Sequence, residues 1–432
     1  MRCVGLAYQA WLARRIGAAG VGLWQLVISV NVLSATLAVS GIRFTTTRLV
    51  AEELGSARGG RSGAAVARCL AYAVSFGCAA CLLLFFLAER IGFLWIGDAR
   101  TVASLRVLAF TLPLLSVSSV LNGYFIASGK AWKTALAQTA EQLINVGAVM
   151  GFLRGVPAGY LSESCAAIAR GNLLADAASL LISLALFLPA VPRGEGNAGA
   201  ANRLTGRMLR IALPLALSAY ARTGLTTLEH LLVPRKLRAG GMGADQALGG
   251  YGVITGMVFP ILGFPSCLLG ALAELSVPEL TAAQVRGDRR GIRRAVARLL
   301  CVGLGYSLAV TLVLFLCADV LGRAVYRSAE AGRYIRILAP LVPVMYMDIV
   351  TDGCLKGLGQ MMRSMRYNIS EALLGVALVV TVLPRHGLNG YLLMIALCEL
   401  WNFSLSFARL AKVSGLFGAE DTTRAALSDG PR

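Results

Sequence analysis

The chain repeats itself: residues 65–153 align with residues 295–383 at a constant offset of 230 positions and without a gap. About 24 of the 89 aligned positions are identical, and the register persists through the apolar runs and the segments between them. The matched pairs include Pro113 with Pro343, Gly123 with Gly353, Gly129 with Gly359 and Glu141 with Glu371. Two copies of one apolar unit in a single chain are typical of membrane transporters.

The composition excludes a soluble protein, because 57% of the residues are hydrophobic and 15% are charged, whereas charged residues make up roughly a quarter of soluble domains. Apolar stretches of the roughly 17–25 residues needed to cross a bilayer recur along the chain. The pattern predicts an all-α integral membrane protein with about 12 spans, the first of them incomplete. The predicted spans are 22–47, 64–88, 103–127, 132–153, 164–190, 207–230, 249–276, 295–318, 335–356, 366–383 and 388–411, preceded by an amphipathic piece at 3–14.

The spans divide into two lobes of six helices. We place the N-terminal lobe at 1–191, a hydrophilic glycine-rich linker at 192–206, the C-terminal lobe at 207–412 and a polar tail at 413–432. An even number of helices in each lobe predicts a pseudo-two-fold axis along the membrane normal. The piece at 3–14 is too short to span and lacks a signal-peptide cleavage site. We interpret it as the remainder of the first helix, left by a true truncation or by a start codon further upstream.

Several classes of function are disfavoured by the sequence. The net charge is +19, but the basic residues lie singly at the ends of apolar spans, so no nucleic-acid partner is expected. Cys78 and Cys81 form a C-x-x-C pair inside an apolar run with no histidine nearby, which favours buried small side chains over a metal or redox pair. Without a Walker loop or a dinucleotide fingerprint, we expect no enzyme activity, no cofactor and no metal.

Several segments resemble a known family. They are Arg14–Leu26, Ser40–Glu53, Val117–Phe125 (V-S-S-V-L-N-G-Y-F), Gln138–Gln142 and Asp352–Asn368. In this order they resemble the polysaccharide exporters that include stage V sporulation protein B. These exporters belong to the superfamily of multidrug, oligosaccharidyl-lipid and polysaccharide exporters, which also contains the lipid II flippase.

The resemblance implies two six-helix lobes around a central cavity that opens alternately to each face of the cell membrane. It also implies a cargo such as a saccharide linked to undecaprenyl pyrophosphate. The chain departs from the family pattern at Arg43, where relatives usually carry proline, and in its incomplete first helix. Both departures bear on gating in the first lobe.

Four arginines are candidates to bind the pyrophosphate head group of such a cargo: Arg43, Arg48, Arg170 and Arg222. A guanidinium group matches phosphate oxygens and stays charged when partly desolvated. For Arg48 we favour an anchor that reaches toward lipid phosphates. Arg43 and Arg222 lie nearer the interiors of their spans, and we expect them to line the cavity between the lobes.

The repeated carboxylates Glu141 and Glu371, with Gln138 and Asn368 one turn before them, have two possible roles. One is to couple transport to a proton or a monovalent cation. The other is structural, which we favour because the residue occurs in both lobes. Arg366 is close to Glu371 in sequence, so we expect Glu371 to be the better paired of the two.

Further polar residues and prolines remain in the spans. Asp348, Asp352 and Lys356 are spaced four apart and share a helix face, where mutual neutralisation is the favoured interpretation. Asp352 therefore has either a coupling or a structural role.

Pro113 and Pro343 are expected to bend equivalent helices and to act as hinges. Isolated carboxylates without an evident partner are Asp176, Glu229, Glu274 and Glu399.

These observations favour a flippase that moves a lipid-linked oligosaccharide or polysaccharide precursor across the cell membrane by alternating access. Membrane lipids, and a proton or a monovalent cation, are the other expected partners. One alternative is a cation-coupled drug exporter of the same superfamily. The other is a non-transporting membrane scaffold in cell-wall or spore assembly.

Overall fold

The computed structural model describes residues 2–55, 62–157, 159–190 and 198–416, and within these ranges the chain forms helices and no strand. Eight described helices are long and apolar enough to cross a membrane, or nine if the bent pair Ala99–Ala109 and Thr111–Ala127 forms one span. The predicted spans 132–153, 207–230 and 366–383 fall on α6 (Ala131–Arg154), α8 (Ala198–Ala239) and α16 (Met361–Thr381), which are long but less apolar. The all-α membrane fold predicted from the sequence is confirmed.

The contacts divide the chain into two compact units. Among the described residues, the first holds Cys3–Tyr8 and the chain from Arg15 to Leu231, and the second holds Arg2, Gln9–Arg14 and the chain from Leu232 onward. The division falls inside α8, whereas the sequence places it in the linker 192–206, whose residues 191–197 lie outside the described ranges. The lobe limits 1–191 and 207–412 remain a prediction, and most of the tail 413–432 also lies outside the described residues.

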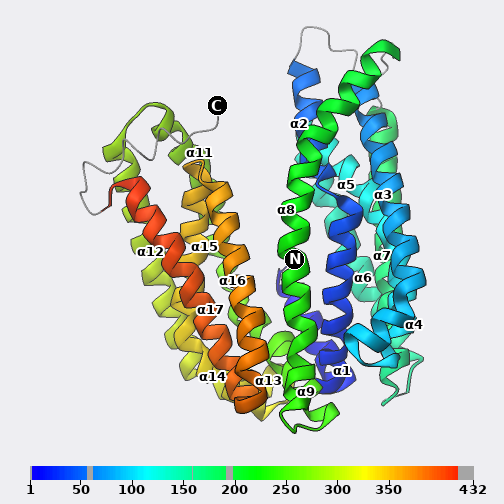
Figure 1. The fold of residues 1–432 in the computed structure, drawn as a ribbon, viewed down its shortest axis with the longest axis vertical. Coiled ribbons are helices and arrows are strands. Elements are labelled where there is room, and N and C mark those ends of the chain that lie inside the picture. Colours follow the sequence, from blue (N-terminus) through cyan, green and yellow to red (C-terminus); the bar gives the residue numbers. More distant parts are fainter. Residues whose placement is uncertain (1, 56–61, 158, 191–197, 417–432) are drawn as a thin grey trace. The chain divides into compact units, whose positions relative to one another are not determined.

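The helices of the first unit pack side by side (Figure 1). Besides α6 they are α2 (Ile42–Gly55), α3 (Ser62–Arg90), α4 (Val102–Ala109), α5 (Thr111–Ala127) and α7 (Leu161–Phe187), with the larger parts of α1 (Arg2–Val39) and α8. A buried cluster joins α2, α3 and α5, with Ile42, Leu121 and Phe125 fully inaccessible at its centre.

The second unit has the corresponding helix pairs (Figure 1). Besides α16 its helices are α9 (Ala244–Val253), α10 (Phe259–Gly263), α11 (Ser266–Val285), α12 (Arg289–Leu316), α13 (Ala318–Tyr326), α14 (Ala329–Leu338), α15 (Val342–Gly357) and α17 (Leu383–Ser414). Here α15 packs against α11, α12 and α17, as α5 packs against α2, α3 and α7 in the first unit.

The sequence repeat, with its offset of 230 positions, is also visible in the interactions within each unit. In the first unit the Arg106 guanidinium pairs with Glu89 at 2.6 Å, and in the second unit Arg336 pairs with Asp319 at 2.7 Å. The turns that end α5 and α15 also match, because Gly129 and Gly359 have φ angles of 70° and 68°. The next amide donates five residues back in both turns, at 2.8 Å. Equivalent positions in the two copies therefore form equivalent ion pairs and turns.

Two of the predicted spans are not continuous helices, so the prediction of an unbroken span is wrong at these two places. The predicted span 22–47 breaks at Ser40 and Gly41, which have φ angles of 46° and 72°, so that α1 ends and α2 begins there. The predicted span 249–276 is divided between α9, α10 and α11, with a π-helical turn at Ile254–Val258. The predicted fragment at 3–14 is helical, since α1 starts at Arg2 and changes direction only at Gly17.

Large apolar side chains lie on the outside of the helices. On α3, Phe86 is 72% exposed, and on α11, Leu275 is 78% exposed and Val285 is 83% exposed. Apolar surface of this kind is found in proteins where a membrane or a partner covers it. With the lengths of the helices, this exposed apolar surface is consistent with a membrane environment.

Candidate functional site

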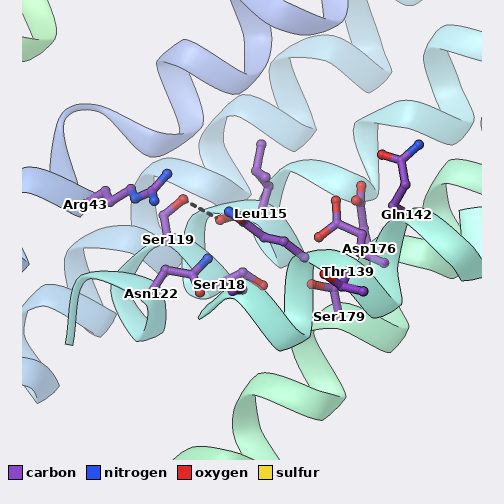
Figure 2. Close-up of a pocket in the computed structure, with 12 residues that line it drawn as sticks. Arg43, Leu115, Ser118, Ser119, Asn122, Thr139, Gln142, Asp176 and Ser179 are labelled. Carbon is purple, nitrogen blue, oxygen red and sulfur yellow. Dashed lines mark hydrogen bonds between the residues drawn. The ribbon is translucent and has the colours of Figure 1, made fainter. Parts of the chain in front are cut away.

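A cavity of about 500 Å³ lies within the first unit, between α2, α5, α6 and α7 (Figure 2). Ten of its twelve lining residues are polar, and they combine one guanidinium, two carboxylates, hydroxyls and amides. The polar lining residues are Arg43 from α2, Ser118, Ser119 and Asn122 from α5, Gln138, Thr139, Glu141 and Gln142 from α6, and Asp176 and Ser179 from α7.

Glycine allows α5 to lie close to α2 beside this cavity. A Cβ atom at Gly123 would lie 2.7 Å from the carbonyl oxygen of Arg43, too close for any side chain. Thr47 reinforces the approach, because its hydroxyl donates to the carbonyls of Arg43 at 3.0 Å and Gly123 at 3.2 Å. The main chain around Arg43 is thus held directly against α5.

The opposite wall of the cavity is the α6–α7 hairpin. A Cβ atom at Gly171 would meet the Val149 side chain at 2.4 Å, so the missing side chain permits close packing of the two helices. The Asn145 amide donates to the Asn172 side-chain oxygen at 2.6 Å and fixes the register of the hairpin. One turn away on each helix this register brings Glu141 and Asp176 within electrostatic range of each other.

The charges are separated across the cavity. Figure 2 shows Arg43 at one end and Asp176 and Gln142 at the other, with Ser118, Ser119 and Asn122 beside Arg43. The Asn122 side-chain oxygen is buried and has no hydrogen-bond partner among the described residues.

This arrangement can bind a molecule that is both anionic and rich in hydroxyls. The guanidinium of Arg43 offers a planar set of donors that fits phosphate oxygens. The hydroxyls and amides on α5 and α6 can exchange hydrogen bonds with hydroxyl groups. The paired carboxylates at the other end can hold a proton or a cation between them, because two negative charges at close range repel each other.

Of the residues to which the sequence analysis assigned a binding or coupling role, Arg43 and Glu141 line this cavity, together with Gln138 and Asp176, which it noted without assigning a role. Arg48 lies further along α2 and pairs with Glu52 at 2.9 Å. Arg170 on α7 and Arg222 on α8 are exposed and do not line the cavity. The roles proposed for these arginines in cargo binding remain predictions.

Glu371 and Asp352 lie in the second unit, on α16 and α15. Asp352 is engaged by two neighbours: Lys356 lies 2.6 Å away, and the Ser364 hydroxyl donates to the carboxylate. These contacts support the structural interpretation of Asp352. One turn earlier, Asp348 accepts a hydrogen bond from the Asn402 amide at 3.1 Å.

The prolines lie next to interruptions in their helices. α4 and α5 meet at a bend of 41° at Phe110, shortly before Pro113. In the second unit a 3₁₀ turn at Ala339–Leu341 directly precedes Val342 and Pro343. Their action as hinges remains a prediction.

Sequence reasoning indicated no partner for Asp176, which the structure places in the cavity within electrostatic range of Glu141. The sequence contains a signal for this proximity. If Asn145 pairs with Asn172 in a helical hairpin, Glu141 and Asp176, each four residues away, lie opposite each other. Sequence reasoning also missed Ser118 and Asn122, although their spacing of four residues in the segment Val117–Phe125 puts both on one helix face. No sequence signal shows that this face borders an open cavity.

Comparison with known proteins identifies the family. Residues 2–266, more than half of the chain, match the family described as polysaccharide biosynthesis protein. The chain belongs to this family. Residues 237–381 also match the MatE family. The chain is therefore a multi-pass cell-membrane protein and a transporter of the superfamily that unites these families.

Two curated relatives come from Bacillus subtilis (strain 168). Stage V sporulation protein B is 25% identical over 417 residues, which are 91% of this chain and 77% of the relative. Sporulation protein YkvU is 20% identical over 383 residues, which are 87% of this chain and 84% of the relative.

Solved structures show the same fold. The MATE multidrug transporter DinF-BH has a TM-score of 0.70 and 15% identity, with 96% of this chain and 93% of that chain covered. A superfamily transporter from Pyrococcus furiosus has a TM-score of 0.62 and 16% identity, with 95% of this chain and 92% of that chain covered. At these identities the similarity establishes the two-lobe transporter fold.

Proposed function

We propose that the protein is a flippase for a lipid-linked oligosaccharide or polysaccharide precursor, and that the cavity of the first unit receives part of the cargo's head group. The observation that supports this proposal most is the lining of the cavity. Arg43 provides a phosphate-binding group beside Ser118, Ser119 and Asn122, and this combination suits a sugar joined to a diphosphate.

The family and the relatives agree with this cargo class. The family's description refers to polysaccharide biosynthesis, and two relatives are named for sporulation. A precursor for the cell wall or the spore envelope is consistent with both. The polyprenyl chain of such a precursor would remain in the bilayer while the head group crosses, so the transporter needs a polar path beside lipid.

One observation favours the second candidate, a cation-coupled drug exporter. Glu141 and Asp176 form a carboxylate pair in the same cavity, and carboxylates attract cationic drugs. However, no aromatic residue is among the described residues that line the cavity, and flat organic cations bind well on aromatic faces. The lining therefore favours the saccharide.

Reconstitution tests the proposal directly. The purified protein is placed in vesicles that contain a fluorescent polyprenyl-pyrophosphate saccharide, and the label exposed on each face is followed over time with a membrane-impermeant quencher. We expect protein-dependent exchange of the labelled lipid. Parallel vesicles receive a fluorescent lipophilic cation and an imposed pH or sodium gradient.

Each outcome assigns one function. Exchange of the saccharide lipid alone supports the flippase, and accumulation of the cation alone supports the drug exporter. A folded protein that moves neither compound contradicts the transport proposal and leaves the scaffold role.

A further inference from the structure

The turn between α11 and α12 carries the densest positive charge in the described part of the second unit. Five arginines lie within nine residues, and all five are exposed. These residues, which we call the arginine patch, are Arg286, Arg289, Arg290, Arg293 and Arg294.

Almost no acidic side chains offset the positive charge of the patch. Asp288 is the only acidic residue in the segment, and its carboxylate accepts a hydrogen bond from the Gly291 amide at 2.8 Å as the cap of α12. Within the described part of the chain, none of the five arginines forms an ion pair. Arg298, one turn further on, differs because it pairs with Glu279 at 3.1 Å.

The charges are also placed where they disfavour the helix. Arg289 and Arg290 occupy the first turn of α12, next to the positive end of the helix dipole. Arg289 and Arg293 are four residues apart, as are Arg290 and Arg294, so like charges face each other on the helix surface. An external anion would relieve both effects.

The repeat provides an internal comparison. At the offset of 230, the positions of Arg289, Arg290, Arg293 and Arg294 correspond in sequence to Gly59, Gly60, Gly63 and Ala64. Arg298, by contrast, corresponds to Arg68. These positions directly precede the aligned segment 65–153, and the corresponding stretch of the first copy carries only Arg58 and Arg61, at the positions of Asp288 and Gly291. The dense cluster of arginines is therefore particular to the second copy.

The position of the patch along the chain indicates that lipid phosphate groups are the anions close to it. It joins α11 (Ser266–Val285) to α12 (Arg289–Leu316), and both helices are long and apolar enough to cross the membrane. A short turn between two consecutive spans lies at the membrane surface, at the depth of the lipid head groups. Val285, directly before the patch, is 83% exposed and offers an apolar side chain at the same level.

We propose that the arginine patch is a binding surface for anionic phospholipids, which it holds through their phosphate groups. Basic clusters at the end of a membrane span attract anionic lipids by charge, and arginine also forms paired hydrogen bonds with phosphate. The bound lipids would neutralise the first turns of α12 and anchor the α11–α12 hairpin to one leaflet. None of these arginines lines the cavity of the first unit, and the proposal does not depend on the transported cargo.

Lipid binding to the purified full-length chain tests the proposal. The protein in a neutral detergent is titrated with phosphatidylglycerol or with phosphatidylcholine, and bound lipid is counted by native mass spectrometry. The test variant replaces Arg289, Arg290, Arg293 and Arg294 with glutamine. A matched control replaces four other exposed arginines of the same unit with glutamine: Arg327, which follows α13, and Arg323, Arg333 and Arg385, which lie in the short helices α13 and α14 and at the start of α17.

We expect the unsubstituted protein to retain phosphatidylglycerol in preference to phosphatidylcholine, and the test variant to bind phosphatidylglycerol about tenfold more weakly or worse. The control variant should keep the preference, and raised salt should weaken it. If the four-residue variant fails to fold, the double variant Arg289→Gln/Arg293→Gln replaces it, with a smaller loss expected.

Three results overturn the proposal. The first is equal phosphatidylglycerol binding by the test variant and the unsubstituted protein, which would leave the arginines a role only during membrane insertion. The second is an equal loss in the control variant, which would show a general charge effect. The third is binding of polyprenyl pyrophosphate or an acidic peptide, but not phosphatidylglycerol, which would assign the patch to the cargo or to a protein partner.

Discussion

Arg43 follows a break in the chain that orients it. The φ angles of Ser40 and Gly41 are positive, and a Cβ atom at Gly41 would lie 3.1 Å from the Ala212 carbonyl oxygen. The Ser40 hydroxyl hydrogen-bonds to the hydroxyls of Tyr72, at 2.9 Å, and Tyr220. These contacts fix the start of α2, and with it the side of the helix from which Arg43 reaches the cavity.

Glu141 and Asp176 differ from Glu371 in their surroundings, since they share the cavity. If they exchange a proton or a cation during transport, Glu141→Gln and Asp176→Asn should remove the dependence of flipping on pH or on membrane potential. Folded yield should stay normal. The measurement is the rate of lipid exchange in vesicles at several pH values, with and without an imposed potential.

Glu163→Gln is the matched control, because Glu163 is an exposed carboxylate in the first turn of α7. It should leave the pH dependence intact. A structural role is indicated instead if Glu141→Gln and Glu371→Gln lower the melting temperature by similar amounts while the pH dependence persists.

At the scale of helices, both units use glycine to bring equivalent pairs together. A Cβ atom at Gly123 would lie 2.7 Å from the carbonyl oxygen of Arg43 on α2, and one at Gly353 would lie 2.6 Å from the Ala273 side chain on α11. The positions are related by the same offset of 230. Close approach of α5 to α2, and of α15 to α11, is therefore a property of the repeated unit.

Alanine at Gly123 should therefore destabilise the protein. Forcing a methyl group into a closed helix contact lowers the free energy of unfolding by about 1–3 kcal/mol. Gly147→Ala on α6 is the control, since a Cβ atom there meets nothing within 4 Å, and alanine favours the helix. Thermal unfolding in detergent should separate the two variants, and equal melting temperatures would show that α2 and α5 are not tightly packed.

At the scale of the whole molecule, the sequence predicts the repeated helical architecture well. The offset of 230 recurs in the pair Arg106 and Glu89, in the pair Arg336 and Asp319, and in the turns at Gly129 and Gly359. These features are local or lie between neighbouring helices, so the pattern of glycines, charges and apolar runs is sufficient to indicate them.

The sequence is less informative about breaks and cavities. Ser40 lies inside the predicted span 22–47, and its positive φ accompanies hydrogen bonds to tyrosines of α3 and α8 that are distant in sequence. The pairing of Asp176 with Glu141 depends on the register of the α6–α7 hairpin, which close packing at Gly171 and the Asn145–Asn172 hydrogen bond determine. Tertiary contacts of this kind leave no periodic signal in a single sequence.

In the proposed mechanism, Arg43 binds the head group of a lipid-linked saccharide. The most direct test of this claim is the initial rate of flipping in vesicles that contain the fluorescent polyprenyl-pyrophosphate saccharide, measured for Arg43→Ala beside Arg68→Ala. Arg68 is an exposed arginine on α3 of the same unit and does not line the cavity. Hydrogen bonds to a charged group contribute about 1.5–3 kcal/mol, so Arg43→Ala should slow flipping roughly tenfold or more at limiting cargo, while Arg68→Ala keeps the original rate. Flipping by a folded Arg43→Ala variant at the rate of the unsubstituted protein would contradict the claim.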